Sequence, residues 1–250
     1  LAQQHKLTHI EESDLGTVRN AWLLLHDQKI VDLGCKDIPQ KWQSKIEKRI
    51  DMHNALIIPG LVDSHTHTVF AGTRYHEFAG RLNGKTYQQI AQEGGGIQST
   101  VKTTRSSDLQ ELVSVTTQRL NKFLEYGVTS VEVKSGYGLS LEHELMMLEA
   151  LKKIRFHSPV ELVSTCLALH AYPPESKDPE AYILEVTEKL LPQVAENKLA
   201  NFVDVFIEEG YYQVDQLGDF AKKAKELGLG LRVHADEFSD AGACKFAAKW

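Results

Sequence analysis

Short apolar runs alternate along the chain with longer segments in which apolar residues recur at helical spacing. The runs predict strands over 56–63, 128–133, 160–169, 202–207 and 229–233. The segments with helical spacing predict helices over 107–126, 141–156, 179–194, 214–227 and 240–250. Pro192 is expected to interrupt the third of these helices. This succession of strand–helix units predicts parallel β/α architecture.

The first 55 residues follow a different pattern. Two apolar runs, at 21–25 and 29–34, flank a polar turn and predict a β-hairpin. A polar segment over 38–49 is expected to form a short surface helix. We therefore expect a small β-rich domain over 1–55, followed by a β/α domain over 56–250.

Polar and titratable residues follow every predicted strand of the β/α domain. They lie at 63–67, 134–137, 170, 208–209 and 234–237. Periodicity alone leaves two architectures open, a doubly wound open sheet and a (β/α)8 barrel. An open sheet binds ligands only near its switch point, whereas all the βα loops of a barrel converge on its C-terminal face. Polar residues after all of the strands therefore favour the barrel.

His65 and His67 are the first candidate metal ligands. Residues two apart on a strand point to the same face, so both imidazoles are directed at one place. Neutral imidazole is a common ligand of zinc and iron. His234, at the end of another predicted strand, is the best candidate for a third ligand of an open catalytic site. An isolated pair of this kind is more often structural, but a partner in an equivalent position weakens that alternative.

Several other polar residues at or after the strand ends can each be interpreted in two ways. Arg74 suggests an anionic substrate, because a guanidinium group matches a carboxylate; the alternative is a solvated surface arginine. Lys134 is either a carbamylated bridging ligand of a two-metal site or an ordinary ion-pair residue. Candidates to orient a substrate are Tyr137, His170 and Glu237. Taken one at a time, each of these is more often structural.

Composition limits the classes of function. Of 250 residues, 42% are hydrophobic and 25% are charged, which is typical of a globular protein. The net charge of −6 gives no basic field, so we expect no nucleic-acid partner. The apolar runs are far shorter than the ~18 residues of a membrane span, so we expect no membrane partner. The three cysteines are far apart, which suits a reducing compartment, and we expect a cytoplasmic location.

Longer motifs carry a family likeness. The segment PGLVDSHTH at 59–67, together with His234, resembles the metal-dependent amidohydrolase superfamily. Within that superfamily, four further segments resemble the imidazolonepropionase family: GGGIQSTV at 94–101, EVKSGYGL at 132–139, LHA at 169–171 and HADE at 234–237. The likeness extends over residues 55–240, and the second and fourth of these segments are far more specific than the histidine pair.

The resemblance implies a fold and a set of site residues. The fold would be a TIM-type (β/α)8 amidohydrolase barrel, with a small N-terminal domain that forms part of a composite β-sandwich. One divalent metal ion, zinc or iron, would be bound by His65, His67 and His234. The substrate would be bound by Arg74, Tyr137, His170 and Glu237, of which His170 and Glu237 would also be catalytic. Lys134 is similar to a non-bridging lysine of this mononuclear group and is not assigned to the metal.

The reaction implied by the resemblance is a step of histidine degradation. A small anionic substrate, 4-imidazolone-5-propanoate, would be hydrolysed to N-formimidoyl-L-glutamate. Arg74, helped by Tyr137, would hold the carboxylate; Glu237 would bond a ring nitrogen and relay a proton to the leaving nitrogen. His170 would bond the ring oxygen or its developing charge. The alternatives are another amidohydrolase, such as a purine or pyrimidine ring deaminase, and an inactive metal-binding fragment.

The number of β/α units is smaller than a closed barrel requires. A (β/α)8 barrel has eight units, and five fit between residues 56 and 250. We therefore expect the sequence to be a segment of a longer chain, truncated at its C-terminus, with a metal-binding aspartate beyond residue 250. A homodimer is the default expectation for assembly.

Overall fold

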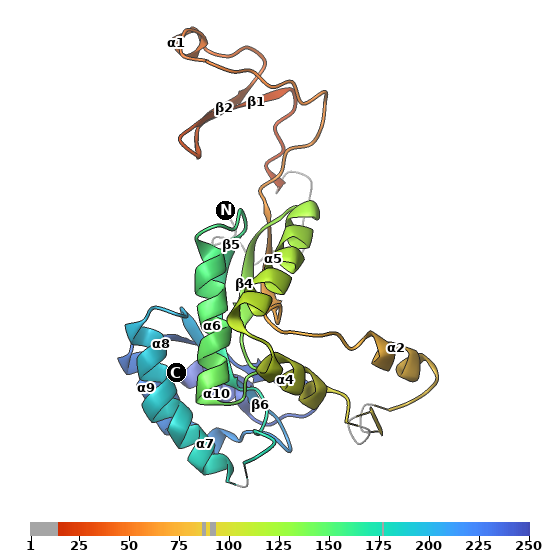
Figure 1. Ribbon diagram of the computed structural model, residues 1–250. Coiled ribbons are helices and arrows are strands. Elements are labelled where there is room, and N and C mark those ends of the chain that lie inside the picture. The colour runs from red at the N-terminus through yellow and green to blue at the C-terminus, as the bar shows by residue number, and fades with distance from the viewer. Residues whose placement is uncertain (1–14, 87–88, 91–93, 177) are drawn as a thin grey trace. The chain divides into compact units, whose positions relative to one another are not determined.

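The computed structural model describes residues 15–86, 89–90, 94–176 and 178–250 (Figure 1). The chain divides into two compact units, Leu1–Pro59 and Gly60–Trp250. The first contains the expected hairpin, in which β1 (Ala21–His26) pairs antiparallel with β2 (Lys29–Cys35). Asp27 and Gln28 at its turn both have positive φ angles, which a tight hairpin turn of two residues requires. The expected surface helix is limited to α1 (Gln40–Gln43).

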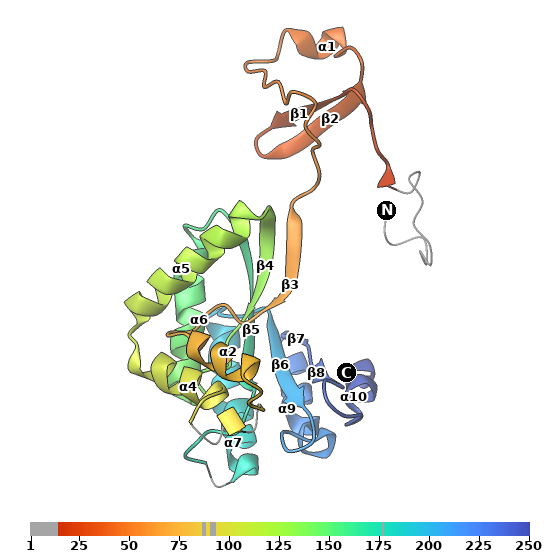
Figure 2. The same ribbon diagram turned by 90° about the vertical axis from the view of Figure 1, so that its right-hand side faces the viewer.

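The second unit is built on a curled parallel sheet (Figure 2). Its strands are β3 (Leu61–Thr66), β4 (Val128–Lys134), β5 (Glu161–Leu169), β6 (Phe202–Ile207), β7 (Gly230–Leu231) and β8 (His234–Ala235). From β3 to β7 each strand pairs with the next one in sequence, and β8 pairs with β6 beyond β7. A doubly wound sheet reverses its strand order, whereas this sheet winds in one direction only, as a barrel does. The expected part of a β/α barrel is confirmed.

Helices separate the strands along the chain. They are α2 (Tyr75–Leu82), α4 (Ile97–Ser106), α5 (Leu109–Glu125), α6 (Leu141–Arg155), α7 (Pro179–Glu185), α8 (Leu191–Glu196), α9 (Gly218–Glu226) and α10 (Ala243–Lys249). Figures 1 and 2 both show α5 and α6 side by side against the sheet. Their apolar faces, including Leu112 and Leu148, pack with Val133 of β4 in the buried core. Within the described residues, every helix is too short or too polar to cross a bilayer.

Several elements differ from the sequence predictions, among them the last strand, expected over 229–233, which is limited to β7 and is followed by β8. The first strand begins at Leu61 rather than at residue 56, because Pro59 has no N–H group to offer the sheet and Leu61 is the first to pair, through Gly127. Pro192 does not break its helix: a π-helical segment, Val186–Leu190, precedes α8 and places the proline in its first turn. The short helix α2 was not predicted, and no residue of it is buried.

Alternation along β4 and β6 decides which side chains reach the inside of the curled sheet. Val131 and Val133 of β4 belong to the apolar core, so Glu132 and Lys134 point to the opposite face. On β6, Val203, Val205 and Ile207 likewise belong to the core, which leaves Asp204, Phe206 and Glu208 on the inner face. The inner face is therefore polar at this level, and its charged groups lie beneath the strand ends that carry the histidines.

Candidate metal-binding active site

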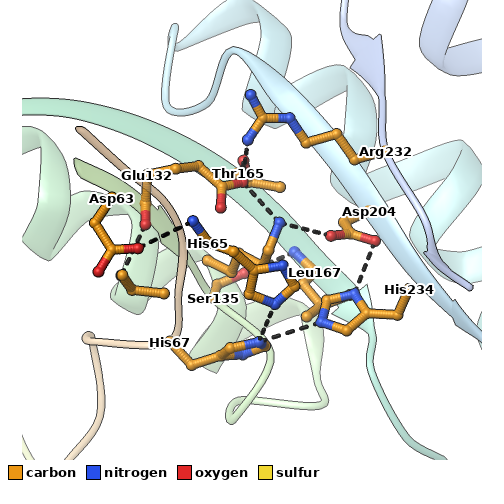
Figure 3. Close-up of polar contacts among 12 residues, drawn as sticks. Asp63, His65, His67, Glu132, Ser135, Thr165, Leu167, Asp204, Arg232 and His234 are labelled. Atoms are coloured by element: carbon orange, nitrogen blue, oxygen red, sulfur yellow. Dashed lines mark hydrogen bonds and ion pairs between the residues drawn. The ribbon is translucent and has the colours of Figure 1, made fainter. Parts of the chain in front are cut away.

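Three histidine side chains converge at the C-terminal ends of the strands (Figure 3). His65 is on β3, His67 is the first residue after that strand, and His234 is on β8. Nε2 of His67 lies 3.3 Å from Nε2 of His65 and 3.2 Å from Nε2 of His234. One ligand atom from each ring lies within 4.8 Å of the others. The structure thus brings together the three residues that the sequence predicted as metal ligands.

A buried carboxylate fixes the orientation of His234. Nδ1 of His234 lies 3.1 Å from Oδ1 of Asp204, a side chain that is 1% exposed. Because the carboxylate accepts a hydrogen bond, Nδ1 carries the proton and the lone pair is on Nε2, directed at the other two histidines. Burial favours the protonated form of Asp204, but the hydrogen bond from His234 and the nearby Lys134 ammonium hold its pKa at about 2.

The surroundings of His65 and His67 lower the pKa of both side chains. Burial, followed by the neighbouring His170 and His234, lowers the pKa of His67 to about 2. Burial and the charge of Lys134 also lower the pKa of His65. Neutral imidazoles whose Nε2 atoms face one another repel through their lone pairs unless a proton or a cation lies between them. This donor set fits a divalent metal ion of the kind that imidazole prefers.

An ion-pair network lies beside the histidines (Figure 3). Nζ of Lys134 lies 2.7 Å from Oε1 of Glu132 and 2.8 Å from Oδ2 of Asp204, and all three side chains are buried. Glu132 also accepts hydrogen bonds from Thr165 and forms an ion pair with Arg232. Of the two interpretations of Lys134, the structure shows the ion pair, because its nitrogen lies between the carboxylates of Glu132 and Asp204.

His170 and Tyr137 lie beside the histidine cluster. The ring of His170 stacks on that of His67, with centroids 5.0 Å apart, and the ring of Tyr137 is 6.0 Å from the same histidine. Nδ1 of His170 lies 2.9 Å from the carbonyl oxygen of Gly136, so it is the protonated nitrogen and Nε2 is an acceptor. Burial lowers the pKa of His170 to about 4, which keeps this tautomer neutral near pH 7.

Arg74 and Glu237, the other two predicted substrate residues, lie outside this cluster. The Arg74 side chain is 39% exposed at the start of α2, and its Nη1 lies 4.0 Å from Oε2 of Glu77. Glu237 is exposed, three residues beyond His234 in the loop after β8. In the part of the chain that the structure describes, no contact joins either residue to the histidines. Their assignment to a substrate stays a prediction.

Comparison with known proteins gives a consistent result. No family model matches the chain. An imidazolonepropionase of Fusobacterium nucleatum is 44% identical over 231 residues, which are 92% of this chain and 56% of that protein. An imidazolonepropionase of Geobacillus kaustophilus is 42% identical over 241 residues, which are 95% of this chain and 57% of that protein. The chain is similar to imidazolonepropionases. It spans little more than half the length of these relatives, and its expected resemblance to the imidazolonepropionase family is confirmed.

Solved structures agree on the fold. A 5-methylcytosine deaminase from Klebsiella pneumoniae matches with a TM-score of 0.65 at 17% identity, over 91% of this chain and 51% of that one. N-isopropylammelide isopropylaminohydrolase from Burkholderia multivorans matches with a TM-score of 0.59 at 17% identity, over 91% of this chain and 53% of that one. At this identity the likeness shows the fold alone. Imidazolonepropionase-like sequence and a segment of a β/α barrel therefore occur together in the chain.

Sequence reasoning missed the carboxylates that support the site. The sequence assigns no role to Asp204, in a predicted strand, or to Glu132, in the EVKSGYGL segment, yet they hold His234 and Lys134 in place. The available signal was a charged residue within an apolar run, as in VDVFI at 203–207. Such a residue is almost never fully buried without a partner, so it indicates that a partner exists on another strand. It does not indicate which one.

Proposed function

We propose that the protein carrying this chain is a metal-dependent imidazolonepropionase, which hydrolyses the cyclic amide 4-imidazolone-5-propanoate to N-formimidoyl-L-glutamate. The observation that carries the proposal is the identity of 42–44% with curated imidazolonepropionases over more than nine-tenths of the chain. The converging histidines at the ends of parallel strands support it. Because the chain spans 56–57% of those relatives, the activity is assigned to the whole protein.

The metal would be one divalent ion, zinc or iron, held by His65, His67 and His234. Three neutral imidazole nitrogens suit either ion. When bound, such an ion supplies hydroxide at neutral pH and polarises a carbonyl group. The hydrogen bond from His234 to Asp204 fixes the ring so that Nε2 faces the other two ligands, which is how an outer carboxylate orients a metal-binding histidine.

His170 would contact the imidazolone ring. Its Nδ1 is occupied by the Gly136 carbonyl oxygen, so the neutral ring offers an acceptor at Nε2. We therefore assign His170 to a ring N–H of the substrate rather than to the ring oxygen, which would require a donor. Its stacking on His67 places this acceptor next to the candidate metal ligands.

Arg74 and Tyr137 would bind the propanoate carboxylate. Arg74 has a guanidinium fork available for two parallel hydrogen bonds, and its present partner, Glu77, is at the outer limit of an ion pair at 4.0 Å. A substrate carboxylate would replace a weak, solvated pair with a closer one. Glu237 would bond a ring nitrogen and pass a proton to the leaving nitrogen.

The alternative enzyme, a ring deaminase, shares the barrel and the histidines. The match to a deaminase structure at 17% identity supports the fold alone and does not favour this activity. Arg74 distinguishes the two activities, because a neutral base needs no carboxylate clamp.

The proposal also includes a cytoplasmic location and a homodimer. Fractionation of the cells would test the location, and sedimentation of the purified protein would test the oligomeric state.

The deciding experiment is hydrolysis of 4-imidazolone-5-propanoate by the full-length protein, followed with and without a metal chelator. We expect turnover that chelation abolishes and that zinc or iron restores. His234→Ala should remove metal binding and turnover together, and full activity of that variant without bound metal would refute the ligand assignment. A folded, metal-loaded protein that does not hydrolyse this substrate would overturn the proposed function, and ring deamination would be assayed next.

A further inference from the structure

The loop after β4 is held by a single buried carboxylate. Glu144 of α6 is 0% exposed. Its Oε1 accepts hydrogen bonds from the backbone N–H groups of Gly138 at 2.7 Å and Leu139 at 2.8 Å, and its Oε2 accepts one from Gly136 at 3.0 Å. A buried carboxyl group is costly unless its oxygens are hydrogen-bonded, and here both are used to bind the loop.

A guanidinium group holds the same loop through its carbonyl groups. Nε of Arg105, on α4, donates to the carbonyl oxygen of Gly138 at 2.6 Å, and its Nη2 donates to that of Leu139 at 2.7 Å. Gly138 and Leu139 are therefore bonded through both their N–H and their C=O groups. Arg105 is fixed in turn by an ion pair of 2.9 Å with Glu175. Two charged side chains from different helices thus clamp one short segment.

Two glycines of the loop lie too close to their neighbours to carry a side chain. A Cβ atom added at Gly138 would lie 2.6 Å from the backbone nitrogen of Glu144. A Cβ atom at Gly136 would lie 2.9 Å from Nδ1 of His170, and the φ angle of Gly136, +113°, is one that other residues rarely adopt. Glycine is required at both positions because the backbone lies close to α6 at Gly138 and close to His170 at Gly136.

The clamped segment carries one predicted substrate residue and fixes another. Tyr137 lies between the two glycines, with its ring 5.4 Å from that of His170. The carbonyl oxygen of Gly136 accepts the hydrogen bond that sets the tautomer and orientation of His170. Any movement of the backbone at Gly136 to Gly138 would therefore displace both side chains at once, and neither Glu144 nor Arg105 itself contacts the histidine cluster among the described residues.

We propose that Glu144 and Arg105 are positioning residues for substrate binding, which act by fixing the backbone that carries Tyr137 and orients His170. The inference rests on the proposed function in so far as those two residues contact the substrate. A positioning role of these two residues can be distinguished from a general contribution to stability. A loosened binding loop raises KM, whereas a smaller folded fraction lowers apparent kcat and leaves KM unchanged.

The test uses E144Q in the full-length, metal-loaded protein, with E142Q as the matched control. Glu142 is exposed on the same helix, so its variant loses the same charge without touching the loop. The glutamine of E144Q keeps the volume of the side chain, but its NH2 group faces a backbone N–H wherever it is placed. Hydrogen–deuterium exchange at the three loop amides, bound metal, and KM and kcat for 4-imidazolone-5-propanoate are measured.

We expect the three loop amides of E144Q to exchange at least about tenfold faster, as loss of one charge-assisted hydrogen bond implies. The Ser135 amide, which bonds to Thr165, should stay protected. KM should rise by a similar factor at unchanged metal content, and E142Q should match the wild type. R105K, with R81K on α2 as its control, should also raise loop exchange and KM, but by a smaller factor. It replaces E144Q as the test if E144Q does not fold.

Unchanged exchange at the loop amides in both clamp variants would overturn the inference. So would faster exchange with wild-type KM, because the loop would then not position the substrate. Failure of the proposed function gives a different result: the wild-type protein itself, folded and loaded with metal, would not hydrolyse 4-imidazolone-5-propanoate, while the exchange measurement would still report whether the clamp holds the loop.

Discussion

Replacing Asp204 by asparagine should weaken metal binding, because the side chain has two partners that an amide cannot satisfy together. Oδ1 of Asp204 accepts from Nδ1 of His234, and Oδ2 accepts from Lys134. An asparagine that presents its oxygen to His234 directs its NH2 group at an ammonium. The flipped amide directs NH2 at Nδ1, which must then lose its proton, so that the proton moves to Nε2 and blocks the metal-binding lone pair.

The expected loss in metal affinity is about 10–100-fold, or about 1.4–2.7 kcal/mol, the usual cost of removing an outer partner of a metal-binding histidine. Competition with a chromophoric chelator at neutral pH measures the Kd for Zn²⁺ directly. D219N, on the exposed surface of α9, is the control for loss of one negative charge. A folded D204N protein whose Kd stays within a factor of about three of the wild-type value would refute the role assigned to Asp204.

Three further outcomes follow from the site. Arg74→Ala should raise KM about tenfold or more through loss of a charge-assisted hydrogen bond to the substrate, with little change in kcat, while Arg81→Ala should leave KM unchanged. Glu237→Gln should lower kcat at constant metal content; loss of the metal instead would make Glu237 a ligand. Glu208 accepts hydrogen bonds from Ser239 and from the Phe238 amide, which lower its pKa from 4.5 to about 2. The ionised carboxylate therefore contributes fully to the free energy of unfolding above pH 4.5, and this contribution declines as the pH falls toward 2. The difference in urea midpoint between wild type and Glu208→Gln should accordingly narrow on acidification.

The order of strands and helices in the barrel segment was predictable because each element buries an apolar face. Val128 begins a run whose alternate members enter the core, and Leu112 and Leu120 share one face of α5. Elements without such a face were not predictable. Helix α2 buries no residue and has only eight residues, which is too short a segment for helical spacing to be distinguished from that of a loop. The start of β3 depends on Pro59, whose effect on pairing requires knowledge of the neighbouring strand.

The cluster of three histidines was predictable for a different reason. His65 and His67 are neighbours in sequence, and the equivalent place of His234 after another strand follows from the parallel architecture. The residues that support them come from pairs far apart in sequence, such as Lys134 with Asp204 and Glu144 with the loop after β4. Which buried charge meets which is set by strand register and helix placement, and neither is encoded in a local pattern.

The ion-pair network adds to the effect of burial on the pKa of His67, which is lowered to about 2. Two buried carboxylates, Glu132 and Asp204, are matched by two cations, Lys134 and Arg232. A proton on His67 would add a charge that burial and the neighbouring Lys134 disfavour. In the proposed site the three imidazoles would instead hold a divalent metal ion. The carboxylate of Asp204, which accepts a hydrogen bond from His234, would stabilise that ion through the histidine ring.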